Sequence, residues 1–294
     1  MQKRWQAAGL LIGVGLLAAV LIMPHVRSRS EAKIAPASVP ALDYNVLGRV
    51  NSTVYTLTIP PGYTIRPFLA ETALTVEQVA KQTKALAVIN AGFFDPINQK
   101  TTSMVVIDGR EVANPKDNER LVNNPKLSGY LSTILNRSEF RVYQCGTQVK
   151  YGIGFRSEPI SSGCQLSQAV GGGPQLLPKN TAQQEGFTDY AKGELIRDAI
   201  GGQQPNARTA IGLKPDGSVV WVMVAQTKAK ASGMTLDELA DLMKRLGVES
   251  ALNLDGGTSS SLYAQGGAVY GKQDETGQPM KRAVKSMLLL TKSP

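Results

Sequence analysis

The chain has 294 residues, of which 42% are hydrophobic and 29 are glycine. This composition excludes a largely disordered chain and predicts a loop-rich folded protein with a sizeable core. The formal net charge of +9 suits nucleic acid, an anionic membrane or an acidic polymer as partner. Because the lysines and arginines are scattered and no nucleic-acid module is recognisable, we expect no nucleic-acid partner and a basic surface beside an anionic envelope. The only histidine, His25, precedes the folded region, which therefore has none for catalysis or zinc.

The N-terminus has the pattern of a membrane anchor. Lys3 and Arg4 precede an apolar segment that runs to Met23 and is interrupted only by Gln6. At about 1.5 Å per residue, a helix of this length is just long enough to cross a bilayer. No small-residue cleavage site follows directly, so we predict an uncleaved signal anchor or transmembrane helix rather than a cleaved signal peptide.

The predicted domain organisation follows from this anchor. We predict an anchor over residues 1–23, a flexible tether over 24–43 that contains Pro36 and Pro40, and a folded domain over 44–294. Basic residues flank both sides of the anchor, so the positive-inside rule gives little information about its orientation in the membrane. We expect the domain on the periplasmic or extracellular side of the membrane, or secreted if the signal is cleaved.

Alternating and β-branched residues predict several strands in the folded region. These are residues 54–59, 63–70, 87–89, 103–107, 129–135, 140–143, 169–170, 208–213, 218–225, 251–254 and 283–291, together with a strand from 111 onward. Gly-containing turns at 60–62, 108–109 and 215–217 predict that the strands on either side pair back as hairpins. Residues 75–86 and 235–246 are amphipathic and predict helices, the second with Thr235 as N-cap and Gly247 after its end.

The remaining segments predict loops. Residues 114–124 are rich in Asn, Pro and charge, residues 151–165 are irregular, and residues 179–204 are polar and long enough to form a mobile flap over a site. The whole pattern predicts an α+β fold, with mixed twisted β-sheets, a few helices and a single catalytic domain behind the anchor.

The two predicted helices begin with similar sequences, at residues 74–80 and 234–240. Each helix is followed by a short strand that ends in a polar motif, Asn90-Ala-Gly92 in one case and Asn253-Leu-Asp255 in the other. The similarity is either a coincidence between two ordinary helix starts or a half-repeat. A half-repeat predicts that the two strand ends lie side by side and form one site.

The segment 251–263 carries the densest chemistry. Asp255 lies at the predicted strand end, Gly256 and Gly257 allow a sharp turn and close backbone approach, and four hydroxyl residues follow at 258–261. If these residues open a helix, its free N–H groups attract anions. The alternative is an ordinary Asp-Gly turn between two strands.

Four ordered motifs resemble those of the phosphodiester glycosidase family, whose mammalian member removes N-acetylglucosamine from a phosphodiester and uncovers mannose 6-phosphate. The motifs are Asn-Leu-Asp-Gly-Gly-Thr-Ser-Ser-Ser at 253–261, Ile-Asn-Ala-Gly-Phe-Phe-Asp at 89–95, Gly-Gly-Gly-Pro-Gln-Leu-Leu at 171–177 and Arg-Thr-Ala-Ile-Gly at 208–212. The resemblance covers about residues 44–290. It implies a hydrolase that cleaves the glycosidic bond of a sugar-1-phosphodiester on an envelope or extracellular glycan.

The resemblance assigns three catalytic residues. Asp255 is the carboxylate at the anomeric carbon, as nucleophile, base or oxocarbenium stabiliser. Arg208 grips the departing phosphate with two donors, although an arginine at a strand start is also a common surface charge. Asp95 is a possible second carboxylate, and its alternative role is to begin a turn before Pro96.

The resemblance also implies a substrate-binding set: Asn90, Gly92, Phe93, Gly172, Gly173, Asn253, Gly256, Gly257, Thr258 and Ser259. Pro178 follows Leu177 near a position where the family often has glycine, so this wall of the site is expected to differ. We expect no cofactor, with a calcium or magnesium ion held by Asp95 and Asp255 as the alternative. A non-catalytic protein that binds anionic envelope glycans or lipid phosphates remains the alternative function.

Cys145 and Cys164 are the only cysteines. Two cysteines in an exported domain usually pair, so we predict a disulfide and an oxidising compartment. Two free buried thiols in a cytosolic protein are the alternative.

Overall fold

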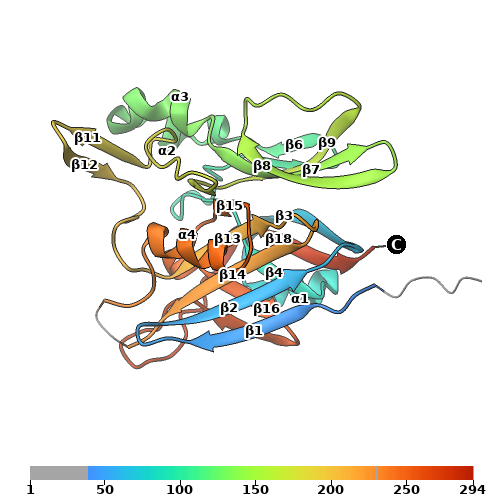
Figure 1. Ribbon diagram of the computed structural model, residues 1–294. Coiled ribbons are helices and arrows are strands. Elements are labelled where there is room, and N and C mark those ends of the chain that lie inside the picture. The colour runs from blue at the N-terminus through green and yellow to red at the C-terminus, as the bar shows by residue number, and fades with distance from the viewer. Residues whose placement is uncertain (1–38, 229–230, 294) are drawn as a thin grey trace, which may run out of the picture. The chain divides into compact units, whose positions relative to one another are not determined.

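A computed structural model of the chain describes residues 39–228 and 231–293 (Figure 1). The predicted anchor at 1–23 and most of the predicted tether lie outside the described residues. No helix in the ranges that are described combines the length and the apolar character needed to cross a bilayer. The chain from residue 39 onward clusters as one unit.

Antiparallel sheets dominate the described chain. The six-stranded sheet has the order β1 (Asp43–Gly48), β2 (Ser52–Ile59), β14 (Val219–Gln226), β13 (Arg208–Leu213), β15 (Ser250–Asn253) and β10 (Gln175–Leu177). A five-stranded sheet has the order β17 (Gly267–Tyr270), β16 (Ser261–Ala264), β4 (Ala87–Asn90), β18 (Val284–Lys292) and β3 (Tyr63–Leu74). The other five-stranded sheet has the order β6 (Arg110–Ala113), β5 (Val105–Ile107), β9 (Cys164–Gly171), β7 (Ser138–Cys145) and β8 (Gln148–Phe155).

The remaining elements are short. Strands β11 (Thr188–Ala191) and β12 (Glu194–Asp198) form a separate hairpin. The helices are α1 (Val76–Thr83), α2 (Glu119–Val122), α3 (Leu131–Ile134) and α4 (Leu236–Arg245), with 3₁₀ turns η1 (Pro115–Asp117), η2 (Pro125–Tyr130) and η3 (Gly257–Ser259).

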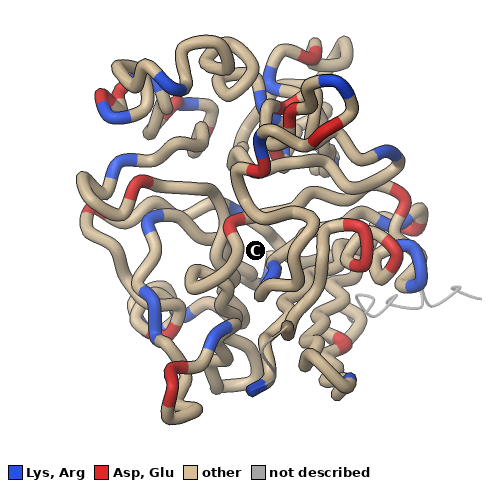
Figure 2. The backbone as a smooth tube through the Cα atoms, turned by 90° about the vertical axis from the view of Figure 1, so that its left-hand side faces the viewer, with Lys and Arg blue, Asp and Glu red and all other residues tan. Residues whose placement is uncertain are grey.

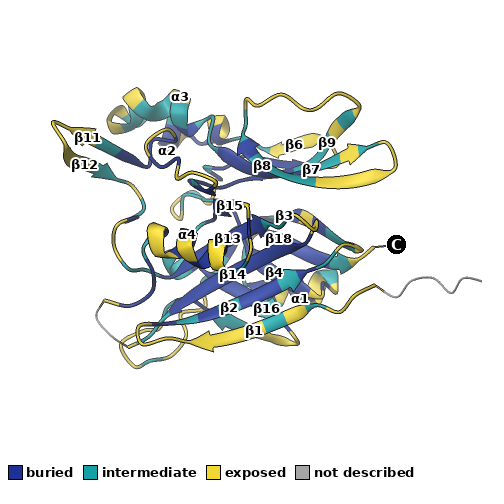
Figure 3. Cartoon of the chain, in the orientation of Figure 1, coloured by how far each residue is buried: buried dark blue, intermediate teal, exposed yellow. Residues whose placement is uncertain are grey.

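Strand β14 explains why the core has two layers. Its whole length from Val219 to Ala225 is buried, as Figure 3 shows for this central strand. Because side chains alternate across a strand, Trp221 and Met223 pack into the core between the sheets, whereas Val220 and Val222 pack on the opposite face beneath α4. A strand buried on both faces needs a continuous apolar run, which this one has.

The two longer helices begin as predicted. Thr75 and Thr235 are N-caps, and each forms a capping box with the residue three positions later, Gln78 or Glu238. Gly247 follows α4 with a φ of +77°, a conformation that favours glycine. Helix α1 packs on the sheet that contains β4, and α4 packs on the sheet that contains β15. In each of the two similar segments, the helix therefore covers the sheet that its following strand joins.

Several predicted features of the fold are wrong. Strand β3 does not pair back on β2 across the 60–62 turn; it pairs with β18 in another sheet. Residues 129–135 form η2 and α3 instead of a strand, and the loop predicted at 114–124 contains η1 and α2. Residues 151–155 and 164–165 belong to β8 and β9, whereas 156–163 are irregular as predicted. The paired strands are antiparallel where mixed sheets were expected.

Two further predictions concern the upper part of Figure 1. Cys145 and Cys164 are disulfide-bonded, as predicted, and lie opposite each other in the pairing of β7 and β9. The segment 179–204, predicted as a flap, contains the β11–β12 hairpin and the fully buried Glu185. The fold is thus mostly β-sheet with few helices.

Candidate functional site

The ends of β4 and β15 meet in the structure, as the half-repeat predicted. The Asn90 side chain at the end of β4 donates from Nδ2 to the backbone carbonyl of Asp255 at 2.6 Å. The backbone N–H of Asp255 in turn donates to the carbonyl of Ala91 at 2.8 Å. These two bonds place the predicted catalytic carboxylate at the junction of two sheets.

Asn90 is fully buried and uses its amide group within the protein. Its Oδ1 accepts hydrogen bonds from Thr209 Oγ1 at 2.9 Å and from the backbone N–H of Ser261 at 3.0 Å. With the bond to Asp255, the side chain joins its own strand to β13 and to the segment 255–261, which are all distant in sequence. Its geometry therefore suits a positioning residue rather than the sugar contact implied by the resemblance.

Asp255 has an unusual carboxyl group. Burial raises the pKa of this group to about 6, although hydrogen bonds from Ser259 and from the Gly256 amide, and the charge of Arg282, each lower it. Gly256 N–H donates to Asp255 Oδ1 at 2.9 Å. The residue as a whole is only partly buried. A carboxyl group with such a pKa changes protonation near neutral pH.

Arg282 is the cation that the sequence did not predict. It lies on the segment before β18, its guanidinium carbon is 5.8 Å from the ring centroid of Phe94, and its charge acts on Asp255. Arg282 Nε is buried without a hydrogen-bond partner in the structure. A guanidinium with a free donor beside a carboxylate is suited to bind an anion. No local pattern identifies Arg282, because it is one of several cations in a polar loop.

Arg208 uses most of its hydrogen-bond donors within the protein. Its guanidinium is buried and donates to four backbone carbonyls: Met234 at 2.9 Å, Ile200 at 3.2 Å, Gly201 at 2.5 Å and Gln204 at 2.8 Å. Burial lowers its pKa to about 10. Since a guanidinium has five N–H donors, one remains, which does not allow a two-pronged grip on phosphate. Arg208 instead ties the end of the 179–204 segment to β13.

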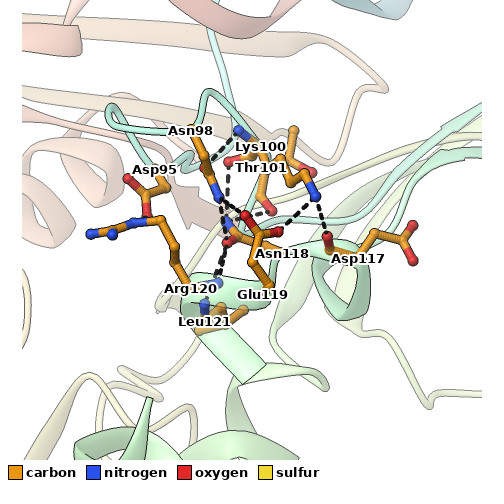
Figure 4. A network of polar contacts seen from close by, with 9 residues as sticks. All are labelled: Asp95, Asn98, Lys100, Thr101, Asp117, Asn118, Glu119, Arg120 and Leu121. Carbon is orange, nitrogen blue, oxygen red and sulfur yellow. Dashed lines mark hydrogen bonds and ion pairs between the residues drawn. The ribbon is translucent and has the colours of Figure 1, made fainter. Parts of the chain in front are cut away.

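Asp95 belongs to a separate polar network (Figure 4). Its Oδ2 accepts from Arg120 Nε at 2.7 Å, and its Oδ1 accepts from the Ile97 amide at 2.8 Å. Burial alone raises the pKa of Asp95, but these hydrogen bonds and the Arg120 charge outweigh it and hold the pKa below its usual value. The bond to Ile97 is that of an Asp beginning a turn, which was the alternative role.

The predicted glycines bring protein segments together. A Cβ on Gly92 would lie 2.8 Å from Ser103 Cβ, one on Gly172 would lie 2.7 Å from the Asn253 carbonyl, and one on Gly173 would lie 2.5 Å from Glu185 Oε2. Asn253 Nδ2 also donates to the Gly173 carbonyl at 2.7 Å. These positions need glycine for packing around β15. Asn253 Oδ1 has no partner in the structure although it is buried.

Phe93 and Phe94 both belong to contacts between aromatic rings and arginines. The Phe93 ring lies 5.7 Å from that of Phe187, and the guanidinium carbon of Arg137 lies 3.6 Å from the Phe187 centroid. Phe94 instead contacts Arg282. Burial lowers the pKa of Arg137 to about 10. No local pattern in the sequence identifies Phe187 or Arg137.

The hydroxyl-rich segment does not open an α-helix. It forms the three-residue turn η3, with Gly257 at a φ of +63°. Ser259 is buried beside Asp255, whereas Thr258 is partly exposed. A Cβ on Gly256 would lie 3.0 Å from the Ala207 carbonyl, so this glycine also serves packing. Within the described ranges, no three His, Cys, Asp or Glu side chains gather as metal ligands.

Comparisons with known proteins agree with this geometry. The phosphodiester glycosidase family model matches residues 83–291. The curated proteins include none that is significantly similar to the chain. A hypothetical protein from Synechocystis is 18% identical with a TM-score of 0.57, and the match covers 85% of this chain but only 61% of that one.

The catalytic domain of zebrafish N-acetylglucosamine-1-phosphodiester alpha-N-acetylglucosaminidase, auto-inhibited by its pro-peptide, is also 18% identical. Its TM-score is 0.63, and the match covers 87% of this chain and 85% of that domain. At this identity the two structural likenesses show a shared fold, whereas the family model covers more than half of the chain. The chain belongs to the phosphodiester glycosidase family and is a glycosidase, as its four motifs predicted.

Proposed function

We propose that the protein hydrolyses a sugar-1-phosphodiester on an envelope or extracellular glycan, with N-acetylglucosamine linked to phosphate as one example. The observation that carries this proposal is the Asp255 carboxyl group, held at the junction of two sheets by its bonds to Asn90 and Ala91 and acted on by the charge of Arg282. A carboxylate next to a cation suits a reaction centre that is positive in the transition state and releases an anion.

The leaving group explains why one carboxylate and one cation are sufficient. Water adds to the anomeric carbon, the bond from that carbon to the phosphate oxygen breaks, and a phosphate monoester leaves. The second pKa of such a monoester is about 6, so it departs with little protonation. Ionised Asp255 stabilises the developing oxocarbenium charge or attacks it, and Arg282 stabilises the phosphate that leaves.

The N-terminal segment supports a location for this reaction. Its sequence suits a membrane anchor, and the Cys145–Cys164 disulfide suits an oxidising compartment. We place the domain on the periplasmic or extracellular side. Protease added to intact cells, or to spheroplasts where an outer membrane is present, is expected to digest the domain. Complete protection of the domain under these conditions would show that the proposed orientation is wrong and that the domain faces the cytoplasm.

A screen of sugar-1-phosphodiesters with product identification tests the activity. We expect release of a reducing sugar and a phosphate monoester by the parent protein, and loss of release in Asp255→Asn. The alternative, a non-catalytic protein for anionic glycans or lipid phosphates, predicts saturable binding with no product from any substrate. The products also identify the sugar that the site accepts.

A further inference from the structure

A second concave surface lies at the other end of β13 from the candidate site. The groove has a volume of about 730 Å³ and is bounded by the start of β3, the β13–β14 turn and the β7–β8–β9 sheet. Leu213 and Lys214 line it, whereas Arg208 at the start of β13 lies next to the candidate site. At about 3.4 Å per residue, the five steps from Arg208 to Leu213 separate the two places by roughly 17 Å. A volume of this size is typical of a small-molecule site.

The charged side chains that line the groove are mainly cationic. Arg66, Lys150 and Lys214 line it, with Asp108 as the one acidic residue among them. The Asp108 carboxylate accepts a hydrogen bond from Gln168 Nε2 at 2.9 Å. Among the described residues, no hydrogen bond or ion pair engages the charged groups of the three cations. The groove therefore carries a net positive charge, although the nearby Asp216 carboxylate interacts electrostatically with Lys214.

The neutral lining has the chemistry that binds sugars. Tyr63 and Tyr151 line the groove together with Thr64, Gln144 and Ser167. Gln144 Nε2 and Ser167 Oγ donate to backbone carbonyls of Gly146 and Val142, so these two side chains offer mainly acceptor oxygens. Two hydrogen bonds orient the tyrosines: Tyr63 OH donates to the Pro40 carbonyl at 3.1 Å, and Tyr151 OH donates to the Tyr63 carbonyl at 3.3 Å. Tyr151 also stacks on Phe140 with 5.6 Å between ring centroids. Rings held in place beside polar groups can pack on sugar rings and bond their hydroxyls.

From the groove we infer a second binding site, for an acidic saccharide whose carboxylate or phosphate groups pair with Arg66, Lys150 and Lys214. Nucleic acid fits less well, because the basic residues are spread over the described chain and form no continuous stripe (Figure 2). A lipid tail also fits less well, because it would leave the charges of Arg66, Lys150 and Lys214 without an anionic partner. This site takes no part in the reaction at Asp255. It would hold an anionic glycan chain on the surface of the protein, away from the candidate site.

Binding of trigalacturonate to the full chain in neutral detergent micelles tests the inference by calorimetry. We expect binding that weakens as salt is added, and little binding of the neutral trisaccharide maltotriose. The double variant Lys150→Gln/Lys214→Gln should bind trigalacturonate about tenfold more weakly, since two of the three cations are lost. The matched control Lys81→Gln/Lys116→Gln removes two exposed lysines elsewhere and should change binding less than twofold.

A variant of the active site tests whether trigalacturonate binds in the groove rather than at Asp255. Asp255→Asn should bind trigalacturonate as the parent does, and unchanged thermal unfolding should show that the lysine variants are folded. Binding of trigalacturonate no tighter than maltotriose, or an unchanged affinity in the Lys150→Gln/Lys214→Gln variant, would overturn the inference. So would a dependence on these two lysines seen only with added phosphatidylglycerol, because the groove would then face a membrane surface.

Discussion

Asn90 holds Asp255 from a strand in another sheet, through a bond of 2.6 Å between its Nδ2 and the Asp255 carbonyl. Asn90 also accepts from Thr209 and Ser261, so one buried amide joins β4, β13 and the segment leading into β16 to the strand end that carries the carboxylate. The position of the candidate catalytic group is therefore a property of the assembled sheets. Two segments with similar sequences, each a capped helix followed by a short strand, meet at this bond.

Asn90→Asp should destabilise the protein by about 3 kcal/mol or more. The carboxylate keeps the acceptors for Thr209 and Ser261 but loses the donor to Asp255 and adds a buried charge without a cationic partner. Urea unfolding of the two proteins measures the difference. Asn45→Asp, on the exposed strand β1 (Figure 3), is a control that should change stability little. Equal stability of Asn90→Asp and the parent would refute the structural role.

Asp255→Asn should lower kcat on a sugar phosphodiester by at least about a hundredfold. The amide nearly preserves shape but removes the charge that faces or attacks the developing oxocarbenium ion. Steady-state kinetics with a nitrophenyl-type sugar phosphodiester measures the loss. Asp108→Asn, at an exposed turn remote from β15, should retain parent activity. A folded Asp255→Asn protein that turns over at the parent rate would rule out the carboxylate assignment.

The same substitution should stabilise the protein in a way that depends on pH. The folded-state pKa of Asp255 is about 6, above its usual value of 3.8. A raised carboxyl pKa means that stability is lost as pH rises through this window, by about 3 kcal/mol at most. Asparagine does not ionise, so the Asp255→Asn protein does not lose stability in this pH window. Unfolding at pH 4 and pH 8 should therefore show similar stability at the lower pH and a more stable Asp255→Asn protein at the higher one. A difference that does not vary with pH would contradict the raised pKa.

Arg208→Lys should cost about 2–4 kcal/mol of stability. A lysine has no planar fork to satisfy the four carbonyls that Arg208 bonds, and buried carbonyls without donors are costly. Denaturant unfolding measures this, with Arg110→Lys on exposed strand β6 as the control. At temperatures where Arg208→Lys is folded, KM for the phosphodiester should change little. A large rise in KM with parent stability would instead restore the phosphate-gripping role.

Arg282→Gln should lower kcat/KM on sugar phosphodiesters by about tenfold or more, because the charge beside Asp255 is lost. The Arg282 charge lowers the Asp255 pKa, so its removal should also move the acid limb of the pH profile to higher pH. Lys281→Gln is the matched control, since Lys281 is exposed and, among the described residues, forms its one ion pair with Glu77, at 4.0 Å. Equal losses in the two variants, or an acid limb that does not move, would contradict the role of Arg282.

Local interactions decided what the sequence alone could predict. The caps at Thr75 and Thr235, the 215–217 turn and the apolar run of β14 depend on neighbours within a few residues, so their patterns are legible in the chain. The four motifs predicted the family, and two cysteines in a single chain left one possible pairing, which the structure contains.

Long-range contacts decided the rest. The 60–62 turn predicted a hairpin, but β3 has its apolar partner in β18, more than 200 residues away, and only packing of the whole core selects that partner. Arg208 matched a motif, yet carbonyls from residues 200–204 and 234 take its donors. Arg282 matched no pattern and still reaches Asp255. A side chain's donors and charge are visible in sequence, whereas the groups that meet them are set by tertiary structure, since hydrogen bonds and ion pairs act only at short range.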